Sequence, residues 1–227
     1  MLPTAFIAIT GLFIGKYLPK DKWLITSVVF GAMLPDIEWI FISIASLLTS
    51  SSLSIFHRTL THSLFFPIIL YLVIAIISEL RKLPYIKIIG RGIVIGVLLH
   101  ILFDIFLWIL PVSFFWPLPI KLKQFWFIET IEVWIDYLML SLNFLFFRIY
   151  AWILIQRAVE NHSINIWFVK PLSIWMNIEF WLFILFILLT YFQVQYFYSF
   201  FSIAYVPSLL FALFSTFYMN DAIDIEE

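Results

Sequence analysis

The sequence predicts an all-α fold, a polytopic transmembrane bundle of about seven spans plus a re-entrant segment. Of the 227 residues, 64% are hydrophobic and only 12% are charged, and the mean hydropathy is +1.07. A soluble domain is about 45–50% apolar and about 25% charged. Phe occurs 27 times and Trp 10 times, which suits lipid contact and the aromatic belts at membrane surfaces. A water-soluble fold could not bury this much apolar surface, so the bilayer is the expected solvent.

Apolar runs define the expected helices in chain order, at 2–15, 23–34, 37–49, 63–80, 88–110, 129–156, 172–192 and 196–219. A span needs about 20 apolar residues, so the last four runs qualify by length and the first three are short. The first run has no basic segment before it and no cleavage pattern after it, so we expect a retained helix. Pro35 disfavours helix at the residue before it. We therefore expect the chain to turn there, with 37–49 re-entrant or interfacial.

The distribution of Lys and Arg predicts the orientation of the bundle. Most of the 13 basic residues lie in three breaks between the apolar runs, at 16–22, 79–91 and 157–171. Short cytoplasmic loops carry an excess of Lys and Arg, so these three breaks are expected on the cytoplasmic side. The N-terminus and the segment from Asp36 to His62 then lie on the outer side.

Composition also excludes several classes of function. The formal net charge of −1 provides no basic stripe for a nucleic acid, so nucleic acid is excluded as a partner. The chain has no Cys, which excludes disulfides, thiolate zinc sites and thiol nucleophiles. Any metal must therefore be held by His and carboxylate side chains. Nothing in the sequence sets the oligomeric state.

Three clusters of ionisable residues interrupt the apolar pattern: Asp36 with Glu38, the segment His57–Ser63, and His100 with Asp104. Burying such groups in a membrane is costly, so each cluster is a candidate functional site. The spacing of His100 and Asp104 places both on one helix face. The expected spans bring all three clusters to one level in the outer half of the membrane. Imidazole and carboxylate suit zinc and related divalent ions, so a mixed metal site is predicted.

Simpler interpretations of these clusters stay open. His100 and Asp104 could form a hydrogen-bonded pair that stabilises helix packing. His57 and Arg58 could belong to a loop exposed at the headgroups. Asp36 after a proline could be only a turn residue or a helix N-cap.

A second polar stripe and a capping signal complete the candidates. The run 129–156 carries Glu129, Glu132, Asp136 and Asn143 at helical spacing. The stripe could face the same cavity, or it could be an interfacial acidic end that pairs with Arg58, Lys121 or Lys123. Thr61 or Ser63 could cap the helix that follows.

Four motifs together carry a resemblance to a known family. They are Leu34-Pro35-Asp36-Ile37-Glu38, His57-Arg58-Thr59-Leu60-Thr61-His62-Ser63, the stretch from Gly96 through His100 to Asp104, and Trp116-Pro117. In order and spacing the sequence resembles the YdjM-like family of membrane-bound metal-dependent hydrolases. The resemblance implies a multi-pass protein of the prokaryotic cytoplasmic (inner) membrane. It makes 1–128 the YdjM-like hydrolase region and 129–227 additional transmembrane helices of the same bundle.

The resemblance also implies a division of roles among these residues. Asp36, His57, His62, His100 and Asp104 would bind a divalent metal, with zinc expected. Glu38 would act as a general base or orient a ligand His, and Arg58 would clamp a phosphate. Expected neighbours or substrate contacts are Thr61, Ser63, Trp116, Glu132 and Asp136. The H-x-x-x-D helix also resembles that of zinc-dependent phospholipases C, which implies phosphoester cleavage on a membrane lipid or lipid-linked substrate.

The sequence departs from the family pattern at three places. A family His in the first helix has no counterpart in Ala5–Ala8, Thr59 replaces a loop Gly, and Ile105–Leu110 replaces a Thr- and Gly-containing segment. Two alternatives to a hydrolase follow. A transporter or metal-permeation protein would line a path with the same polar residues, although we find no inverted repeat of the kind that marks many transporters. The missing His favours an inactive structural relative.

Overall fold

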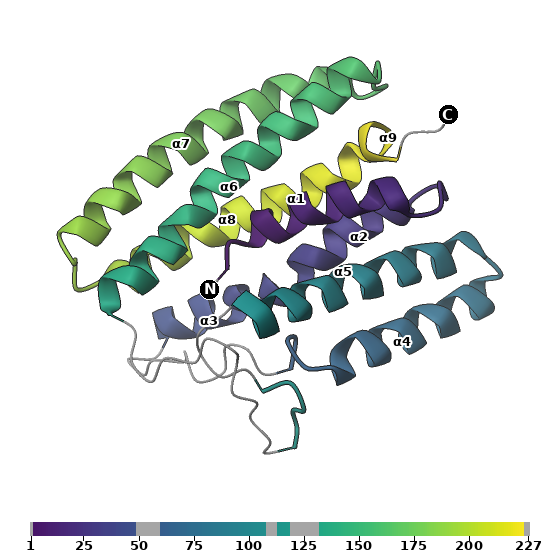
Figure 1. The fold of residues 1–227 in the computed structure, drawn as a ribbon, viewed down its shortest axis with the longest axis horizontal. Helices are drawn as coiled ribbons and strands as arrows, with labels where there is room; N and C mark the ends of the chain where they lie inside the picture. The colour runs from purple at the N-terminus through teal and green to yellow at the C-terminus, as the bar shows by residue number, and fades with distance from the viewer. Residues whose placement is uncertain (1, 49–59, 108–112, 119–131, 225–227) are drawn as a thin grey trace.

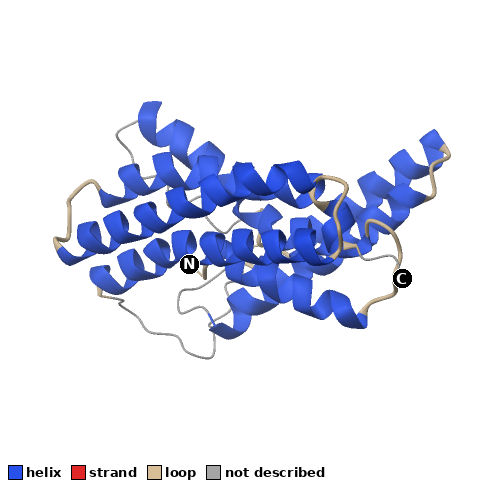
Figure 2. Ribbon diagram, turned by 90° about the horizontal axis from the view of Figure 1, so that it is seen from above, coloured by secondary structure: helices blue, strands red, loops and turns tan. Residues whose placement is uncertain are grey.

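The computed structural model describes residues 2–48, 60–107, 113–118 and 132–224. The α-helices are α1 (Thr4–Ile14), α2 (Leu24–Met33), α3 (Glu38–Leu48), α4 (Phe65–Arg81), α5 (Tyr85–Leu107), α6 (Val133–Glu160), α7 (Val169–Tyr191), α8 (Phe197–Tyr218) and α9 (Asn220–Ile223) (Figure 1). Short 3₁₀ helices are η1 (Gly15–Tyr17), η2 (Leu34–Ile37) and η4 (Ile166–Phe168). The described ranges contain no strand (Figure 2). The all-α prediction is confirmed for these residues.

Among the residues that the structure describes, five helical segments are long and apolar enough to cross a membrane. They are Leu24–Ile44, Tyr85–Phe106, Val133–Glu160, Ile166–Tyr191 and Phe197–Tyr218. The segment Thr4–Tyr17 is a shorter apolar helix, and α4 has 17 residues. The structure therefore supports a polytopic membrane bundle, and the exact count of seven spans is not confirmed.

The expected turn at Pro35, with a separate re-entrant segment over 37–49, is not observed. Instead α2 continues through η2 into α3, and Leu24–Ile44 forms one candidate span. Pro35 lies in the first turn of η2, where a missing N–H is tolerated and the fixed proline φ suits a helix. The proline thus changes the helix type locally without reversing the chain.

The basic breaks predicted to lie on one side of the membrane do lie at one end of the bundle. Figure 1 shows the α1–α2, α4–α5 and α6–α7 connections there, together with the C-terminal end of the described chain. We call this the basic end. The start of α4 and the end of α5 lie toward the opposite end.

Helices α2 and α5 pack backbone against backbone, and glycines make this close approach possible. A Cβ on Gly96 would lie 2.1 Å from the Val28 carbonyl oxygen, and one on Gly31 would lie 2.2 Å from the Ile93 carbonyl oxygen. Small residues at such spacing allow membrane helices to pack backbone to backbone. Gly96 precedes His100 by four residues, so the face of α5 that touches α2 continues into the candidate site.

Aromatic side chains fill the other half of the core, between α6 and α8. On α8, Phe197, Phe201 and Tyr205 follow one another at a spacing of four residues, and all three are fully buried. The rings of Phe201 and Tyr205 stack with centroids 4.9 Å apart. This column directs the Tyr205 hydroxyl toward the start of α1.

Candidate metal centre

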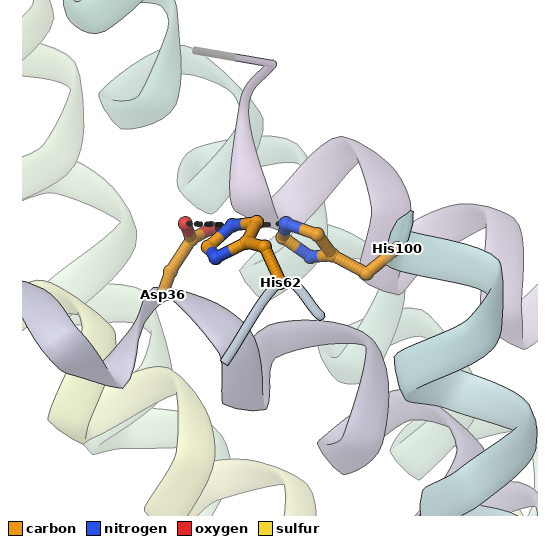
Figure 3. A group of neighbouring side chains, drawn as sticks. All are labelled: Asp36, His62 and His100. Atoms are coloured by element: carbon orange, nitrogen blue, oxygen red, sulfur yellow. Dashed lines mark ion pairs between the residues drawn. The ribbon is translucent and has the colours of Figure 1, made fainter. Parts of the chain in front are cut away.

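Three elements far apart in the sequence deliver the candidate ligands. Asp36 lies in η2, His62 lies in the turn before α4, and His100 lies on α5 (Figure 3). One ligand atom from each lies within 4.8 Å of the others. The exposed fractions are 0% for Asp36, 1% for His62 and 2% for His100. The structure therefore brings these residues together in a buried group that could hold a metal ion.

Asp104 adds a second carboxylate to this group. Its Oδ2 lies 3.4 Å from His62 Nε2 and 3.6 Å from His100 Nε2. Asp36 lies 3.8 Å from His62 Nε2 through Oδ1 and 3.9 Å from His100 Nε2 through Oδ2. Each imidazole Nε2 therefore faces both carboxylates.

A hydrogen bond to the backbone orients the His100 ring, so that Nε2 points to the two carboxylates. His100 Nδ1 lies 2.7 Å from the carbonyl oxygen of Ala32. A carbonyl can only accept, so Nδ1 carries a proton, and Nε2 is the ring nitrogen that faces the carboxylates. In the 3₁₀ register the N–H of residue 35 would bond to this carbonyl, but Pro35 has no N–H. The proline thus leaves the Ala32 carbonyl available to His100.

His62 is oriented in the same sense by Thr61 and Glu38. The Thr61 hydroxyl donates to Glu38 Oε2 at 2.6 Å, and its oxygen lies 3.0 Å from His62 Nδ1. The Thr61 hydroxyl has one proton, which it donates to Glu38. His62 Nδ1 is therefore the donor to the Thr61 oxygen. Glu38 Oε1 lies 3.6 Å from the same nitrogen. His62 Nε2 therefore faces Asp36 and Asp104.

Asp36 is held by residues at the other end of the sequence. The Thr4 hydroxyl donates to Asp36 Oδ2, and the Tyr205 hydroxyl, 2.5 Å away, donates to the Thr4 oxygen. The Thr4 N–H, which has no partner within its own helix turn, donates to Asn143 Oδ1 at 2.9 Å. Helices α1, α6 and α8 therefore all help to position one carboxylate.

The donor set fits a divalent cation. Asp36 Oδ1 and Asp104 Oδ2 are buried and have no hydrogen-bond partner among the described residues, and leaving such atoms unsatisfied is costly. Two neutral imidazoles and two carboxylates in this arrangement would repel one another unless a cation lay among them. Ligand atoms around a tetrahedral ion with bonds of about 2.1 Å are separated by about 3.4 Å. The imidazole–carboxylate separations of 3.4–3.9 Å approach that value, and one ligand atom from each of Asp36, His62 and His100 lies within 4.8 Å of the others.

The remaining predicted site residues have different positions. His57 and Arg58 lie outside the described residues. Glu38 is buried beside His62.

Ser63 does not cap α4, because its hydroxyl donates to the Leu60 carbonyl at 2.7 Å. The N-cap residue of α4 is Leu64, and no side chain caps the helix there. Thr61 does not cap α4 either, since its proton is directed to Glu38.

The acidic stripe of α6 does not enter the metal-capable group as a whole. Glu132 is exposed, and Asp136 accepts a hydrogen bond of 2.7 Å from the Tyr198 hydroxyl. Asn143, two turns further, is the member that reaches the network, through Thr4. Trp116 is 39% exposed, and Glu129 lies outside the described residues.

Sequence reasoning missed Thr4 and Tyr205. Both are polar residues in apolar helices, and neither has a neighbour at helical spacing that would mark it as part of a site. Their only signal is that a buried hydroxyl in a membrane requires a partner.

The model of the YdjM inner membrane protein family matches residues 4–199. The matched segment includes α6 and α7, beyond the four motifs of the first half. No curated protein and no solved structure matches the chain.

Proposed function

Because the chain belongs to the YdjM inner membrane protein family and is a multi-pass integral protein of the inner membrane, we propose that it is a membrane-embedded metal-dependent hydrolase. The observation that carries this proposal is the buried group of Asp36, His62 and His100, whose ligand atoms lie within 4.8 Å of one another. Asp104 would be a fourth ligand. We propose zinc as the ion, since two imidazoles and two carboxylates are ligands that zinc accepts.

The residues around the group would prepare it for hydrolysis. A bound divalent ion supplies Lewis acidity, which activates water and polarises the oxygen of an ester. Ala32 and the Thr61–Glu38 pair hold the two imidazoles with Nε2 directed inward. Glu38 would orient the His62 imidazole through its other ring nitrogen, or act as the general base for the attacking water.

The proposed substrate class is a phosphoester on a lipid or lipid-linked molecule. The His100–Asp104 spacing, which resembles that of zinc-dependent phospholipases C, supports this choice. The burial of the site within the membrane bundle suits a substrate that is itself membrane-bound. Arg58 would contact the phosphate, for which a guanidinium has the right geometry.

The test is metal analysis of the detergent-purified protein, with phospholipid and phosphoester hydrolysis assayed alongside. We expect His62→Ala and His100→Ala to lose bound zinc and turnover. His162→Asn is the matched control, because His162 is exposed on the α6–α7 connection and adopts a positive φ, which Asn tolerates.

Three results would contradict the proposal. Unchanged metal content in both alanine variants would reject the ligand set. Metal flux in proteoliposomes without turnover would identify a transporter. Bound metal with no hydrolysis of any phosphoester tested would identify an inactive relative.

A further inference from the structure

A groove between α4 and α5 lies on the outside of the bundle, toward the basic end. Its volume is about 420 Å³. Figure 1 shows α4 at the edge of the bundle, next to α5. The groove begins near Tyr71 and Leu72 in α4 and ends at Glu79, Lys87 and Arg91. It therefore runs from an apolar part inside the membrane to a charged part at its surface.

The apolar part has the shape and chemistry of a site for a hydrocarbon chain. Leu72 and Ile76 are 54% and 58% exposed, and they lie one turn apart on the same face of α4. Ala75, between the larger Tyr71 and Glu79 on the neighbouring stripe, leaves the groove open at its centre. A protein surface of this kind in a bilayer contacts lipid acyl chains.

The charged part carries an excess of positive charge. Lys87 forms an ion pair with Glu79, whereas Arg91 makes no ion pair among the residues that the structure describes. Arg91 lies six residues after Tyr85, the start of its candidate span, so it is roughly 9 Å below the end of the helix. A guanidinium at that depth is costly unless it reaches the interface or meets an anion. Arg81, the last residue of α4, and Lys82, its C-cap, add further positive charge at this end of α4.

We propose that the α4–α5 groove binds an anionic glycerophospholipid of the leaflet at the basic end. Its phosphate would contact Arg91 and Lys87, and one acyl chain would lie along Leu72 and Ile76. The ligand is anionic because a zwitterionic headgroup would bring its own cation to a site that already has a cationic excess. Basic pockets between membrane helices are known to bind such headgroups.

This lipid site is separate from the metal centre. Arg91 precedes His100 by nine residues on α5, a distance of about 14 Å along the helix. The inference does not depend on the proposed hydrolase activity, and the two can fail independently.

The test measures binding of dioleoylphosphatidylglycerol to the detergent-purified full chain by native mass spectrometry, with phosphatidylethanolamine and phosphatidylcholine as comparison lipids. We expect a preference for phosphatidylglycerol, and we expect Arg91→Gln to weaken its binding about fivefold, as for the loss of one basic contact near a membrane surface. Lys170→Gln is the matched control, because Lys170 is exposed at the same end of the bundle on α7. It should bind like wild type.

Two further variants separate this proposal from general attraction to a basic surface. Glu79→Gln should strengthen phosphatidylglycerol binding, because it removes the carboxylate that competes for Lys87. Ala75→Phe should weaken binding with every charge intact, because the added ring fills the groove. Zinc content should be unchanged in all four variants.

The proposal is overturned if phosphatidylethanolamine binds as well as phosphatidylglycerol, or if Arg91→Gln and Lys170→Gln have equal effects. Weaker phosphatidylglycerol binding by Glu79→Gln would also overturn it, since Glu79 would then support lipid binding and not compete with the lipid for Lys87. If Arg91→Gln does not fold, the Glu79→Gln and Ala75→Phe results decide the question.

Discussion

Substitution of Gly96 by alanine should separate the helices that carry the metal ligands. The new Cβ would lie 2.1 Å from the Val28 carbonyl oxygen and 2.5 Å from the Ala32 nitrogen. A carbon and a carbonyl oxygen approach to about 3.3 Å at closest, so α5 must move away from α2 by about 1 Å. Both obstructing atoms belong to the backbone, so a change of side-chain rotamer cannot relieve the contact.

The displacement acts directly on the metal centre. Asp36 lies in η2, which directly follows α2, and His100 lies one turn after Gly96 on α5. A shift of about 1 Å between α2 and α5 therefore changes the distance between Asp36 and His100. Metal–ligand distances tolerate only about 0.2 Å. We expect Gly96→Ala to reduce zinc affinity at least 10-fold and to lower the free energy of unfolding by about 1–3 kcal/mol, the usual cost of overpacking.

The assay is zinc competition with a chelator, with thermal unfolding in detergent measured alongside. Gly11→Ala is the matched control, because a Cβ there would meet Val28 Cγ1 at an ordinary 3.5 Å. It should keep zinc affinity and gain slightly in helix propensity. If Gly96→Ala binds zinc within twofold of wild type, the close α2–α5 contact does not position the ligands.

Three further substitutions test contacts away from that helix pair. Thr4→Val removes the hydroxyl that donates to Asp36, and zinc affinity should fall 10–100-fold, as for other residues that orient a ligand. Asp224→Ala removes the acceptor for two N–H groups at the start of α2, and the free energy of unfolding should fall by about 1 kcal/mol. Glu179→Leu breaks the bond of 2.6 Å from Ser208 that joins α7 to α8, at a cost of about 0.6–2 kcal/mol.

A conservative variant is the control for each of these changes. Thr4→Ser and Glu179→Gln keep the hydrogen-bonding groups and should behave like wild type. Burial raises the pKa of Asp224 above its ordinary value, so the cost of burying its charge lowers the free energy of unfolding as pH rises through the raised pKa. Asp224→Asn, which accepts without the charge, should therefore be at least as stable as wild type at neutral pH. A valine, alanine or leucine variant that matches its conservative partner would refute the contact concerned.

The candidate site was predictable where helical spacing alone decides the geometry. His100 and Asp104 share one helix face because they are four residues apart. Because burying an ionisable group in a membrane is costly, such a group in an apolar helix indicates a functional site. The meeting of Asp36, His62 and His100 was expected from the predicted spans, and the structure brings their ligand atoms within 4.8 Å of one another.

Other features depend on tertiary contacts that the sequence does not mark. Pro35 suggested a reversal of the chain, but a proline in the first turn of a 3₁₀ helix also permits continuation. Thr4 and Tyr205 act through a contact between residues 201 positions apart, which no local pattern indicates. Ser63 was a candidate helix cap, but its hydroxyl instead donates to the Leu60 carbonyl within its own turn. The ligand and phosphate roles expected of His57 and Arg58 stay predictions.

The hydrogen bond between Thr4 and Tyr205 also has a consequence for biogenesis. All four candidate ligands lie before residue 105, so they enter the membrane early in synthesis, whereas Tyr205 lies on α8 and follows about a hundred residues later. Until α8 is inserted, the Thr4 hydroxyl lacks the donor that directs its own proton toward Asp36. A nascent chain thus carries every candidate ligand before it can hold one of them in place, and completion of the centre waits for insertion of the last long helix.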